Sequence, residues 1–436
     1  MNLASLQEVF ENSLNRPDLS TESRLLRSAA MGSFGEFGFP SRNHENWRYT
    51  DLKPIVSGGF NPSSQPISSQ QAEQANQELE HAILDANAPR LVFVNGQLFP
   101  NNQSCNQING LNVTTQIGNF EHINHLQGKE FFKSYPLAAL NAAFSAHETL
   151  ISLDKETRIE SPLHLIFINS GTPHRAIQPK IFIDIGASSE LTIVQHFVGS
   201  NPAPSWTNSV TLINQNQDSL LKFYRFQEYH RKQSHTELLK TRVGRNAELK
   251  LGYVDLGGKL IRNDVHIDLA EPGATCSLDG VFLAMQGQHI DNHTRIEHSA
   301  PNTTSNEAFR GIIGEHGRGV FKGKVVVHRN ARGTDAQQSS DNLLLSEHGE
   351  IDTQPELEIY TDDVKCSHGA TVGELDAEQL FYLCSRGVNN ATAKGLLTFA
   401  FANTILQRIE VPEVRKRAAS IIAGELPDYQ NWGGLL

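Results

Sequence analysis

The chain has 436 residues, which is long enough to bury a large core and to form two or three structural regions. Its 48 Asp and Glu residues outnumber the 37 Lys and Arg residues, which gives a formal net charge of -11. This acidic balance argues against a nucleic-acid partner, because phosphate contacts depend on a surplus of cationic side chains.

Neither a secretion signal nor a membrane-spanning segment is visible. The N-terminal sequence MNLASLQEVF has no basic region followed by an apolar core, and no apolar run is long enough to span a bilayer as a helix. We therefore expect a cytoplasmic protein with no membrane partner. The cysteines lie far apart without a CxxC pair, so neither a disulfide framework nor a self-contained zinc or cluster site is encoded. They are Cys105, Cys276, Cys366 and Cys384.

The first 90 residues predict a helical N-terminal region. Apolar side chains recur at helical spacing in three segments, and helix-breaking residues separate them. These segments are residues 5–14, 21–38 and 71–86. Near Pro89 the pattern changes, because the two apolar runs of RLVFVNGQLF flank Asn95 and Gly96, a strong signal for a tight β-hairpin. One more helix is predicted over residues 136–150.

From about Arg158 onward the sequence predicts only short strands separated by polar turns. Several of these turns begin at intervals of 28, 30 and 29 residues. They start at or just before Gly186, Asn214, Gly244 and Gly273. A β-sandwich would also give many short strands, but the regular spacing of similar turns favours the stacked coils of a β-solenoid.

Later turns depart from this spacing, while the strand pattern continues to about Gly373. These turns are residues 314–319, 329–333 and 346–350. Beyond Gly373 the apolar spacing becomes helical, with Pro and Gly at the segment ends. The predicted organisation is a helical region of residues 1–90, a β-helix core of residues 91–373 with an entry hairpin and helix before about residue 158, and a helical domain of residues 374–436.

Several sequence motifs of energy-consuming and hydrolytic enzymes are absent. The sequence has no GxxxxGK[ST] phosphate loop, no GxGxxG after a strand and no GxSxG nucleophile elbow. We therefore expect a protein that is not an enzyme by itself and that receives any energy input from a partner.

Cys366 and His368 are two residues apart, so an extended strand would place both side chains on one face. A thiolate and an imidazole can together bind iron or handle sulfide. Two ligands do not complete a tetrahedral site, so such a site would need ligands from a second chain. From the spacing alone, a buried cysteine that packs as a small apolar side chain beside a hydrogen-bonded histidine, with only a structural role, is favoured.

A second histidine-rich stretch, QHIDNHTRIEH, is followed by two more histidines. The residues are His289, His293, His298, His316 and His328. In a strand, the first two lie too far apart for close chelation, so solvated or stacked histidines are the preferred interpretation. Asp291 and Asn292 are expected to form a turn. The segment HENWRYTDLKPI of residues 44–55 is interpreted as an amphipathic anchor that packs the N-terminal region onto the solenoid.

Near the C-terminus, a set of mainly apolar residues follows a helical spacing that usually indicates core. They are Leu396, Phe399, Ala400, Asn403 and Leu406. A helical domain of this size has little core of its own, so part of this apolar surface is expected to serve a partner.

A rival hypothesis is a β-helix enzyme acting on carbohydrates through paired carboxylates. Its candidates Asp335, Asp341 and Glu347 lie in suitable sequence, but no spacing singles them out.

Three motifs, taken in order along nearly the whole chain, resemble the SufB and SufD family of iron-sulfur cluster assembly proteins. They are HENWRYTDLKP from His44, QHIDNHT from Gln288 and CSHGATVGELDAEQLFYLCSRG from Cys366. The helical N-terminal region with its HENW segment, the modest length and the few cysteines are similar to the SufD branch. An autonomous, SufB-like cluster carrier is the disfavoured alternative, because the cysteines are not clustered.

The resemblance implies a right-handed parallel β-helix flanked by helical domains. It also implies a heterodimer with SufB through the end strands of the two β-helices, and SufC ABC-type ATPases on the C-terminal helices. The isolated chain could pair with a second copy of itself through the same exposed edge. Candidate residues on the SufC side are Arg386, Gly387, Phe399 and Phe401.

By the same resemblance, His368 faces the SufB interface and takes part in forming the nascent cluster. Cys366 matches the neighbouring cysteine of the family, whereas Cys384 matches no family ligand. The implied cofactor is a transient iron-sulfur cluster shared with SufB. The resemblance also permits reduced flavin in the complex, and it implies no cofactor bound stably by this chain alone.

Overall fold

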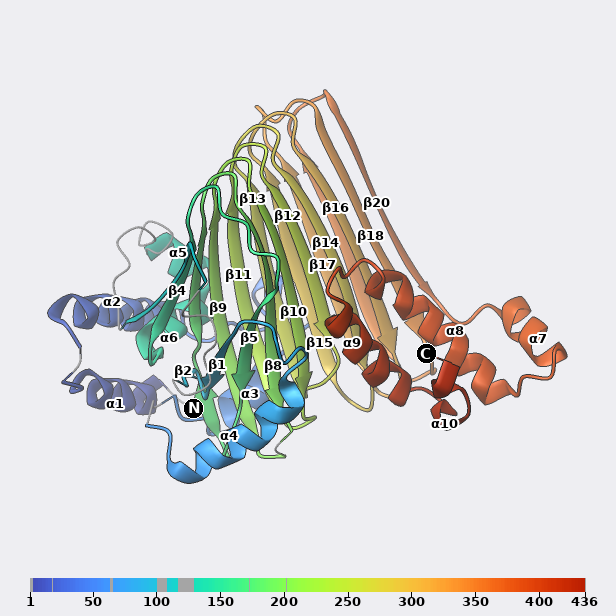
Figure 1. The fold of residues 1–436 in the computed structure, drawn as a ribbon, viewed down its shortest axis with the longest axis horizontal. Coiled ribbons are helices and arrows are strands. Elements are labelled where there is room, and N and C mark those ends of the chain that lie inside the picture. The colour runs from blue at the N-terminus through green and yellow to red at the C-terminus, as the bar shows by residue number, and fades with distance from the viewer. Residues whose placement is uncertain are drawn as a thin grey trace.

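The computed structural model describes residues 3–17, 19–62, 66–99, 108–116, 129–171, 173–200 and 202–435. The chain forms a β-solenoid of about 8 turns with helices at both ends (Figure 1). Strands make up 41% and helices 27% of it, so the predicted mainly β solenoid flanked by helices is confirmed. Cys105 lies outside the described residues.

Four α-helices and a 3-10 helix come before the solenoid. They are α1 (Leu3–Leu14), α2 (Thr21–Phe37), η1 (Glu45–Trp47), α3 (Lys53–Ser57) and α4 (Ser69–Ala82). The hydroxyl of Ser20 caps α2 by accepting a hydrogen bond from the backbone N–H of Ser23. Ser68 and Gln71 form a reciprocal capping box at the start of α4. The three helical segments predicted from the sequence therefore correspond to α1, α2 and α4.

Within the described residues, the entry into the solenoid contains two antiparallel strand pairs and two helices. The elements are β1 (Arg90–Val94), β2 (Gln97–Leu98), β3 (Leu111–Gln116), α5 (Lys129–Ser134), α6 (Pro136–Phe144) and β4 (Glu148–Leu153). Asn95 and Gly96 have φ angles of 51° and 78°, the left-handed conformation that a tight hairpin turn requires. The helix predicted over residues 136–150 is shorter, because residues from Glu148 onward pair with β3 as a strand.

Sixteen further strands form the coils. They are β5 (Leu163–Ile168), β6 (Arg175–Ile177), β7 (Lys180–Ile185), β8 (Glu190–Gly199), β9 (Ser205–Gln215), β10 (Leu220–Tyr229), β11 (Ser234–Val243), β12 (Glu248–Asp255), β13 (Leu260–Leu269), β14 (Thr275–Ala284), β15 (His289–His298), β16 (Thr304–Ile313), β17 (Arg318–Val327), β18 (Thr334–Leu344), β19 (Glu350–Ile359) and β20 (Val364–Gly373). One sheet has the order β2-β1-β5-β8-β10-β12-β14-β16-β18-β20. The other has the order β19-β17-β15-β13-β11-β9-β7-β4-β3.

The turns between the strands stack in two columns, one along each edge of the solenoid. Residues of the first column with positive φ are Ser188, Asp218, Asn246, Gly273, Asn302 and Gly333. Backbone hydrogen bonds join successive turns of this column, such as Asn302 N–H to Arg332 O at 2.8 Å. The turns at residues 314–319 and 346–350 belong to the second column. The predicted loss of regular spacing is therefore wrong, because two regular columns alternate along the chain.

The interior of the solenoid is apolar near its start and partly polar farther along. The rings of Phe93, Phe167 and Phe197 stack with centroids 4.6 and 4.8 Å apart. Deeper in the coil, the fully buried guanidinium of Arg225 binds the carboxylates of Glu237 and Asp255. Because successive strands are in register, side chains at matching positions form rows that run along the solenoid axis.

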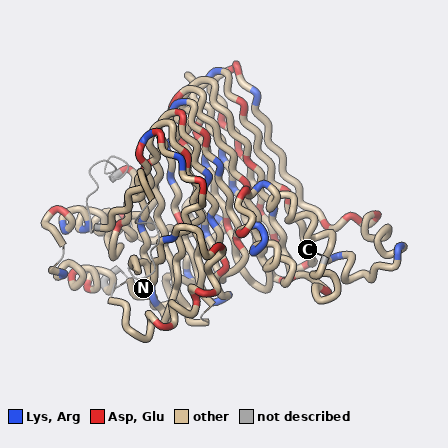
Figure 2. The backbone as a smooth tube through the Cα atoms, viewed as in Figure 1, with Lys and Arg blue, Asp and Glu red and all other residues tan. Residues whose placement is uncertain are grey.

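On the outside, oppositely charged residues of neighbouring coils lie next to one another. Figure 2 shows Lys and Arg interleaved with Asp and Glu along the coils. Examples of such pairs are Arg242 with Glu271 at 2.6 Å, Arg318 with Asp352 at 2.9 Å and Lys324 with Glu358 at 2.5 Å. Exposed pairs of this kind contribute little stability but favour one register between coils.

Four α-helices and a short 3-10 helix follow β20. They are α7 (Ala377–Ser385), α8 (Asn390–Leu406), α9 (Pro412–Gly424), α10 (Tyr429–Trp432) and η4 (Gly433–Leu435). Helices α8 and α9 cover apolar side chains on the outer face of one sheet, including Phe226 and Ile312. Ion pairs also connect these helices to the sheet, such as Arg408 with Asp279 at 2.7 Å. None of the described helices is long and apolar enough to cross a membrane.

Candidate functional site at the open end of the solenoid

The last coil of the solenoid, formed by β19 and β20, is called the open end here. Within the described residues, β19 pairs only with β17 and β20 pairs only with β18, so each strand has one unpaired edge. Large apolar side chains are exposed beside these edges. They are Ile359 at 42%, Tyr360 at 56% and Val372 at 48%. Exposed strand edges with apolar side chains are typical of surfaces that bind another chain.

Cys366 and His368 both lie in β20, at the open end. Their strand partners in β18 are Ala336 and Gln338. Cys366 is half-buried and packs against the apolar cluster inside the solenoid, and His368, on the same face, is exposed. Burial raises the pKa of the Cys366 thiol above its usual range. The predicted pair therefore shares one accessible face, with His368 the more available ligand.

The open end does not hold a complete metal site by itself. No group of three or more His, Cys, Asp or Glu residues in the described part of the chain is placed to bind one ion. Cys276 is buried in β14, and Cys384 lies in α7, outside the solenoid. The structure thus provides two ligands on one face, and a tetrahedral centre there needs ligands from another molecule.

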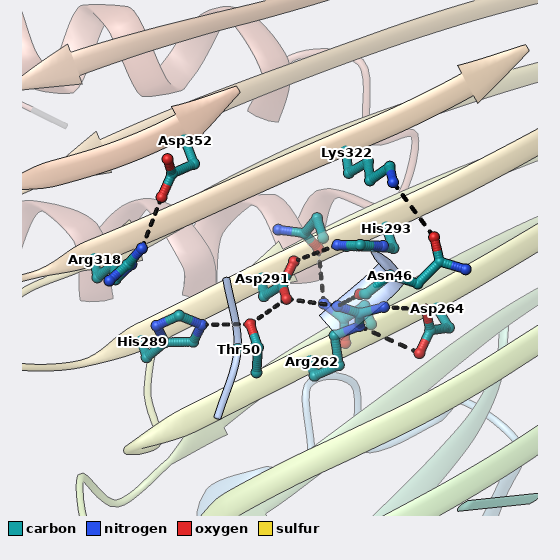
Figure 3. A network of polar contacts seen from close by, with 12 residues as sticks. Asn46, Thr50, Arg262, Asp264, His289, Asp291, His293, Arg318, Lys322 and Asp352 are labelled. Atoms are coloured by element: carbon teal, nitrogen blue, oxygen red, sulfur yellow. Dashed lines mark hydrogen bonds and ion pairs between the residues drawn. The ribbon is translucent and has the colours of Figure 1, made fainter. Parts of the chain in front are cut away.

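The histidine-rich strand β15 forms a separate network on the outer face of the solenoid (Figure 3). The Thr50 hydroxyl lies 2.7 Å from Nε2 of His289 and donates to Oδ2 of Asp291. Nε2 of His293 lies 3.1 Å from the other oxygen of Asp291. Arg262 donates to Asp291 at 2.6 Å. The network therefore joins β15 and β13 to the N-terminal segment.

The electrostatics of this network indicate a structural role. Burial favours the neutral form of Asp291, but Arg262 and His293 more than offset this and hold its pKa well below the usual range. Burial lowers the pKa of His289, so its imidazole is neutral at neutral pH. The carboxylate of Asp291 and the imidazole of His289 thus contact protein partners and are not directed toward a ligand.

The segment of residues 44–55 anchors the N-terminal region on the solenoid, as predicted. The ring of Trp47 lies over the guanidinium of Arg262, with 4.4 Å between Cζ and the ring centroid. The hydroxyl of Tyr49 accepts a hydrogen bond of 2.7 Å from Gln354. The expectation that Asp291 and Asn292 form a turn is wrong, because both lie in the middle of β15.

The remaining histidines of this stretch also have protein partners. The His298 ring points inward, and its two nitrogens form hydrogen bonds with the hydroxyls of Thr303 and Ser305 at 2.8 and 2.9 Å. His328 lies 3.3 Å from Glu297, and the His316 ring packs edge-on against His348. These contacts agree with the interpretation of stacked or solvated histidines.

Helix α7 presents an exposed aromatic surface. Phe381 is 73% exposed and Tyr382 is 56% exposed, and none of the described residues of α7 is buried. The two rings line a groove with residues of α7 and Leu397 of α8. Arg386 stacks on Tyr382 at 5.2 Å, and Gly387 leaves the helix with a φ of 90°. The predicted Arg386 and Gly387 therefore adjoin this surface.

The other two predicted partner-binding residues are placed differently. Phe399 is 8% exposed and packs against Trp432, and Phe401 lies under the guanidinium of Arg310 at 4.6 Å. Both side chains help to fix α8 on the solenoid, and a part of theirs in partner binding stays a prediction. The sequence pattern could not separate them from Phe381 and Tyr382, since aromatic residues at helical spacing indicate a face but not what covers it.

The carboxylates of the rival enzyme hypothesis do not come together. Asp335 and Asp341 lie six residues apart on β18, which corresponds to about 20 Å along a strand. Asp341 lies 3.7 Å from Arg310, and Glu347 is exposed in the turn after β18. Retaining and inverting glycosidases need two carboxyl groups within about 10 Å across a sugar ring.

Sequence reasoning missed two buried polar residues behind the open end, Glu307 in β16 and Gln338 in β18. They are 1% and 4% exposed. The alternation of the strands could have identified them, because every second residue of β16 and of β18 faces inward and both Glu307 and Gln338 occupy such positions. Gln338 Nε2 donates to Oε2 of Glu307 at 2.6 Å.

The chain was also compared with known proteins. The profile described as "SUF system FeS cluster assembly, SufBD core domain" matches residues 167–401. The profile described as "SufBD protein N-terminal region" matches residues 9–165. The chain is 29% identical to the iron-sulfur cluster assembly protein SufD of Escherichia coli, over 89% of this chain and 90% of that protein. A SufBD family protein of Synechocystis is 28% identical over 92% of both chains, and the chloroplastic protein ABCI7 of Arabidopsis thaliana is 27% identical over 97% of this chain and 90% of its own length.

Proposed function

Because the chain belongs to the SufBD family of iron-sulfur cluster assembly proteins, we propose that it is a SufD-type scaffold subunit that works through its open end. The observation that carries this proposal is the uncovered last coil with His368 on its accessible face. A scaffold of this kind holds half of a site, and a SufB-type partner supplies the other half.

The unpaired edges of β19 and β20 support strand pairing with the partner. A second solenoid that adds its own end strands would satisfy the free backbone N–H and C=O groups and would cover Ile359, Tyr360 and Val372. In the absence of that partner, the same edges allow two copies of this chain to pair.

Iron and sulfide are the substrates of the proposed site. Imidazole is a good ligand for iron, so His368 supplies a nitrogen ligand to the site. The raised pKa of Cys366 keeps its sulfur as a thiol until a bound cation lowers it, which gives Cys366 the secondary role. The partner supplies the remaining ligands. Binding of reduced flavin in the complex stays a prediction, and we assign no residue to it. The cytoplasmic location also stays a prediction.

Movement of the site by a SufC-type ATPase would begin at α7. Its exposed Phe381 and Tyr382 offer an apolar surface to a partner, whereas α8 and α9 are fixed to the solenoid by apolar packing and by ion pairs such as Arg417 with Glu228 at 3.0 Å. A force applied to the helical domain would therefore pass to the solenoid as a rigid unit and shift the open end against its partner.

The test is cluster formation in the complex reconstituted with SufB-type and SufC-type subunits. Replacing His368 with Ala should reduce the rate of cluster formation at least tenfold. The control His348→Ala, which changes an exposed histidine in the turn between β18 and β19, should leave the rate unchanged. An undiminished rate in His368→Ala, with the complex intact, would remove His368 from the mechanism.

A further inference from the structure

Five Asp and Glu residues in the described part of the chain are classed as buried, and one of them differs from the others. Four have a cationic partner: Glu148 binds Lys180, Glu237 and Asp255 share Arg225, and Asp291 binds Arg262. The fifth, Glu307, is 1% exposed and forms no ion pair with any described residue. A buried carboxylate without a cation is costly, so this position calls for a different explanation.

Glu307 lies directly behind the open end. Its inward-facing position in β16 is in register with Gln338 in β18, which is in register with His368 in β20. Parallel strands are about 4.8 Å apart, so the backbones at Glu307 and His368 are separated by about 10 Å. Gln338 bridges this interval, and Gly323 of the facing sheet leaves room for its amide, since a Cβ there would lie 2.4 Å from Nε2.

The unpaired atoms of this row indicate the protonation state of the carboxyl. Oε1 of Glu307 and Oε1 of Gln338 are both buried without a hydrogen-bond partner. Both atoms are acceptors when Glu307 is ionised, whereas a protonated carboxyl gains a hydrogen that it can donate. The Thr294 hydroxyl faces the carboxyl from β15 and, like Gln338, lowers the pKa of Glu307, but less than burial raises it. Burial raises the pKa of Glu307 to about 7.

The surroundings hold no compensating positive charge. The titratable side chains that face this row are Cys276 on β14, His298 on β15, and Cys366 and His368 on β20. Burial lowers the pKa of His298 to about 4 and raises that of the Cys276 thiol, so both are neutral at neutral pH. On β17 the row meets Phe321 and Gly323, which carry no charge.

We propose that Glu307 is a buried proton site that is partly protonated at neutral pH and releases this proton when a positive charge binds at the open end. The released proton passes from the carboxyl oxygen to solvent, and the remaining carboxylate compensates one positive charge of the bound ion. No electron is transferred in this step. Glu307 is thus a positioning residue that sets the charge behind His368, and its identification with iron binding rests on the proposed function.

The experiment uses the full chain without partner or metal. Infrared difference spectra between about pH 5 and about pH 9 should show one protonated-carboxyl band that is lost with a midpoint of about 7 and is absent in Glu307→Gln. Glu347→Gln, which removes an exposed carboxyl, should keep this band. A fixed positive charge at the open end, His368→Lys, should lower the midpoint by about 0.5 to 1 pH unit relative to His368→Gln.

Two outcomes would overturn the inference: no band that depends on Glu307, or the same midpoint in His368→Lys and His368→Gln. These outcomes are independent of cluster formation. If His368→Ala abolishes cluster formation but the titration midpoint of Glu307 is the same in His368→Lys and His368→Gln, only the inference fails. If the titration responds to the lysine while His368→Ala still forms clusters, only the proposed function fails.

Discussion

At its N-terminal end the solenoid is covered, whereas its last coil is bare. The antiparallel strands β2 and β3 close the first coils. The segment of residues 44–55 lies farther along and binds the outer face of β13 and β15 through Thr50 and Arg262. At the other end, β19 and β20 leave their edges and three large apolar side chains exposed. The solenoid thus has strands that close its first end and none that close its second end, which supports the proposal that another chain binds at the second end.

The charge of the buried interior also differs between the middle of the solenoid and the open end. In the middle of the solenoid, Arg225 binds Glu237 and Asp255, whereas behind the open end Glu307 has only the neutral Gln338. Replacing Arg225 with Leu would leave two buried carboxyl groups without a cation, so we expect the free energy of unfolding to fall by about 3–5 kcal/mol. Urea unfolding measures this. Arg318→Leu, which changes an arginine on the outer face, should cost less than about 1 kcal/mol, and equal losses for the two variants would contradict the contrast.

The carboxyl behind the open end predicts a pH dependence of stability. Its pKa is about 7 in the folded chain, above the value of about 4.3 in an unfolded chain, so the folded chain holds more protons between these values. Stability therefore falls as the pH rises from about 4.3 to about 7 and levels off above that. Relative to Glu307→Gln, the wild-type chain should lose about 3 kcal/mol across this window. A constant difference between the two curves, measured by urea unfolding, would contradict a titrating Glu307.

At the surface of the open end, a charge should block partner binding without unfolding the chain. The double change Tyr360→Asp and Val372→Asp should weaken association with a SufB-type partner at least tenfold, because it places carboxylates in an apolar contact. Binding is measured by calorimetry, with thermal unfolding of the isolated chain as a check. Phe381→Asp on α7 is the matched control, and it should affect binding of the SufC-type subunit only.

The smallest effect is expected where the N-terminal segment binds the outer face of β13 and β15. Thr50→Val removes the hydroxyl that bonds His289 and Asp291, while Arg262 still compensates Asp291. The free energy of unfolding should fall by about 1 kcal/mol, and cluster formation in the reconstituted complex should stay unchanged. A large loss of cluster formation without unfolding would give this network a functional role.

The sequence predicted the solenoid because each turn of a column needs residues that tolerate a positive φ, such as Asp218 and Asn246. The apparent change in spacing near residues 314–319 was misleading, since one-dimensional spacing does not tell to which of two columns a turn belongs. Asp291 was misplaced for a related reason: Gln286 and Gly287 make the preceding turn, and the polar residues after it continue the strand.

The candidate site was only partly predictable. Strand alternation placed Cys366 and His368 on one face, because period two follows directly from the extended backbone. The change to helical spacing after Gly373 predicted that this strand is the last one, but whether another segment of the chain covers its face is not encoded in short-range patterns. Glu307 was missed because its environment comes from β15, β17 and β18, and no spacing in the sequence brings these strands together.

The most direct test of the open end is hydrogen exchange of the backbone amides with and without the SufB-type partner. The unpaired edges of β19 and β20 should exchange more slowly in the complex, because strand pairing engages their free N–H groups. Amides of β1 and β2 at the covered end should exchange at the same rate in both states. Unchanged exchange in β19 and β20 in a fully formed complex would contradict the account.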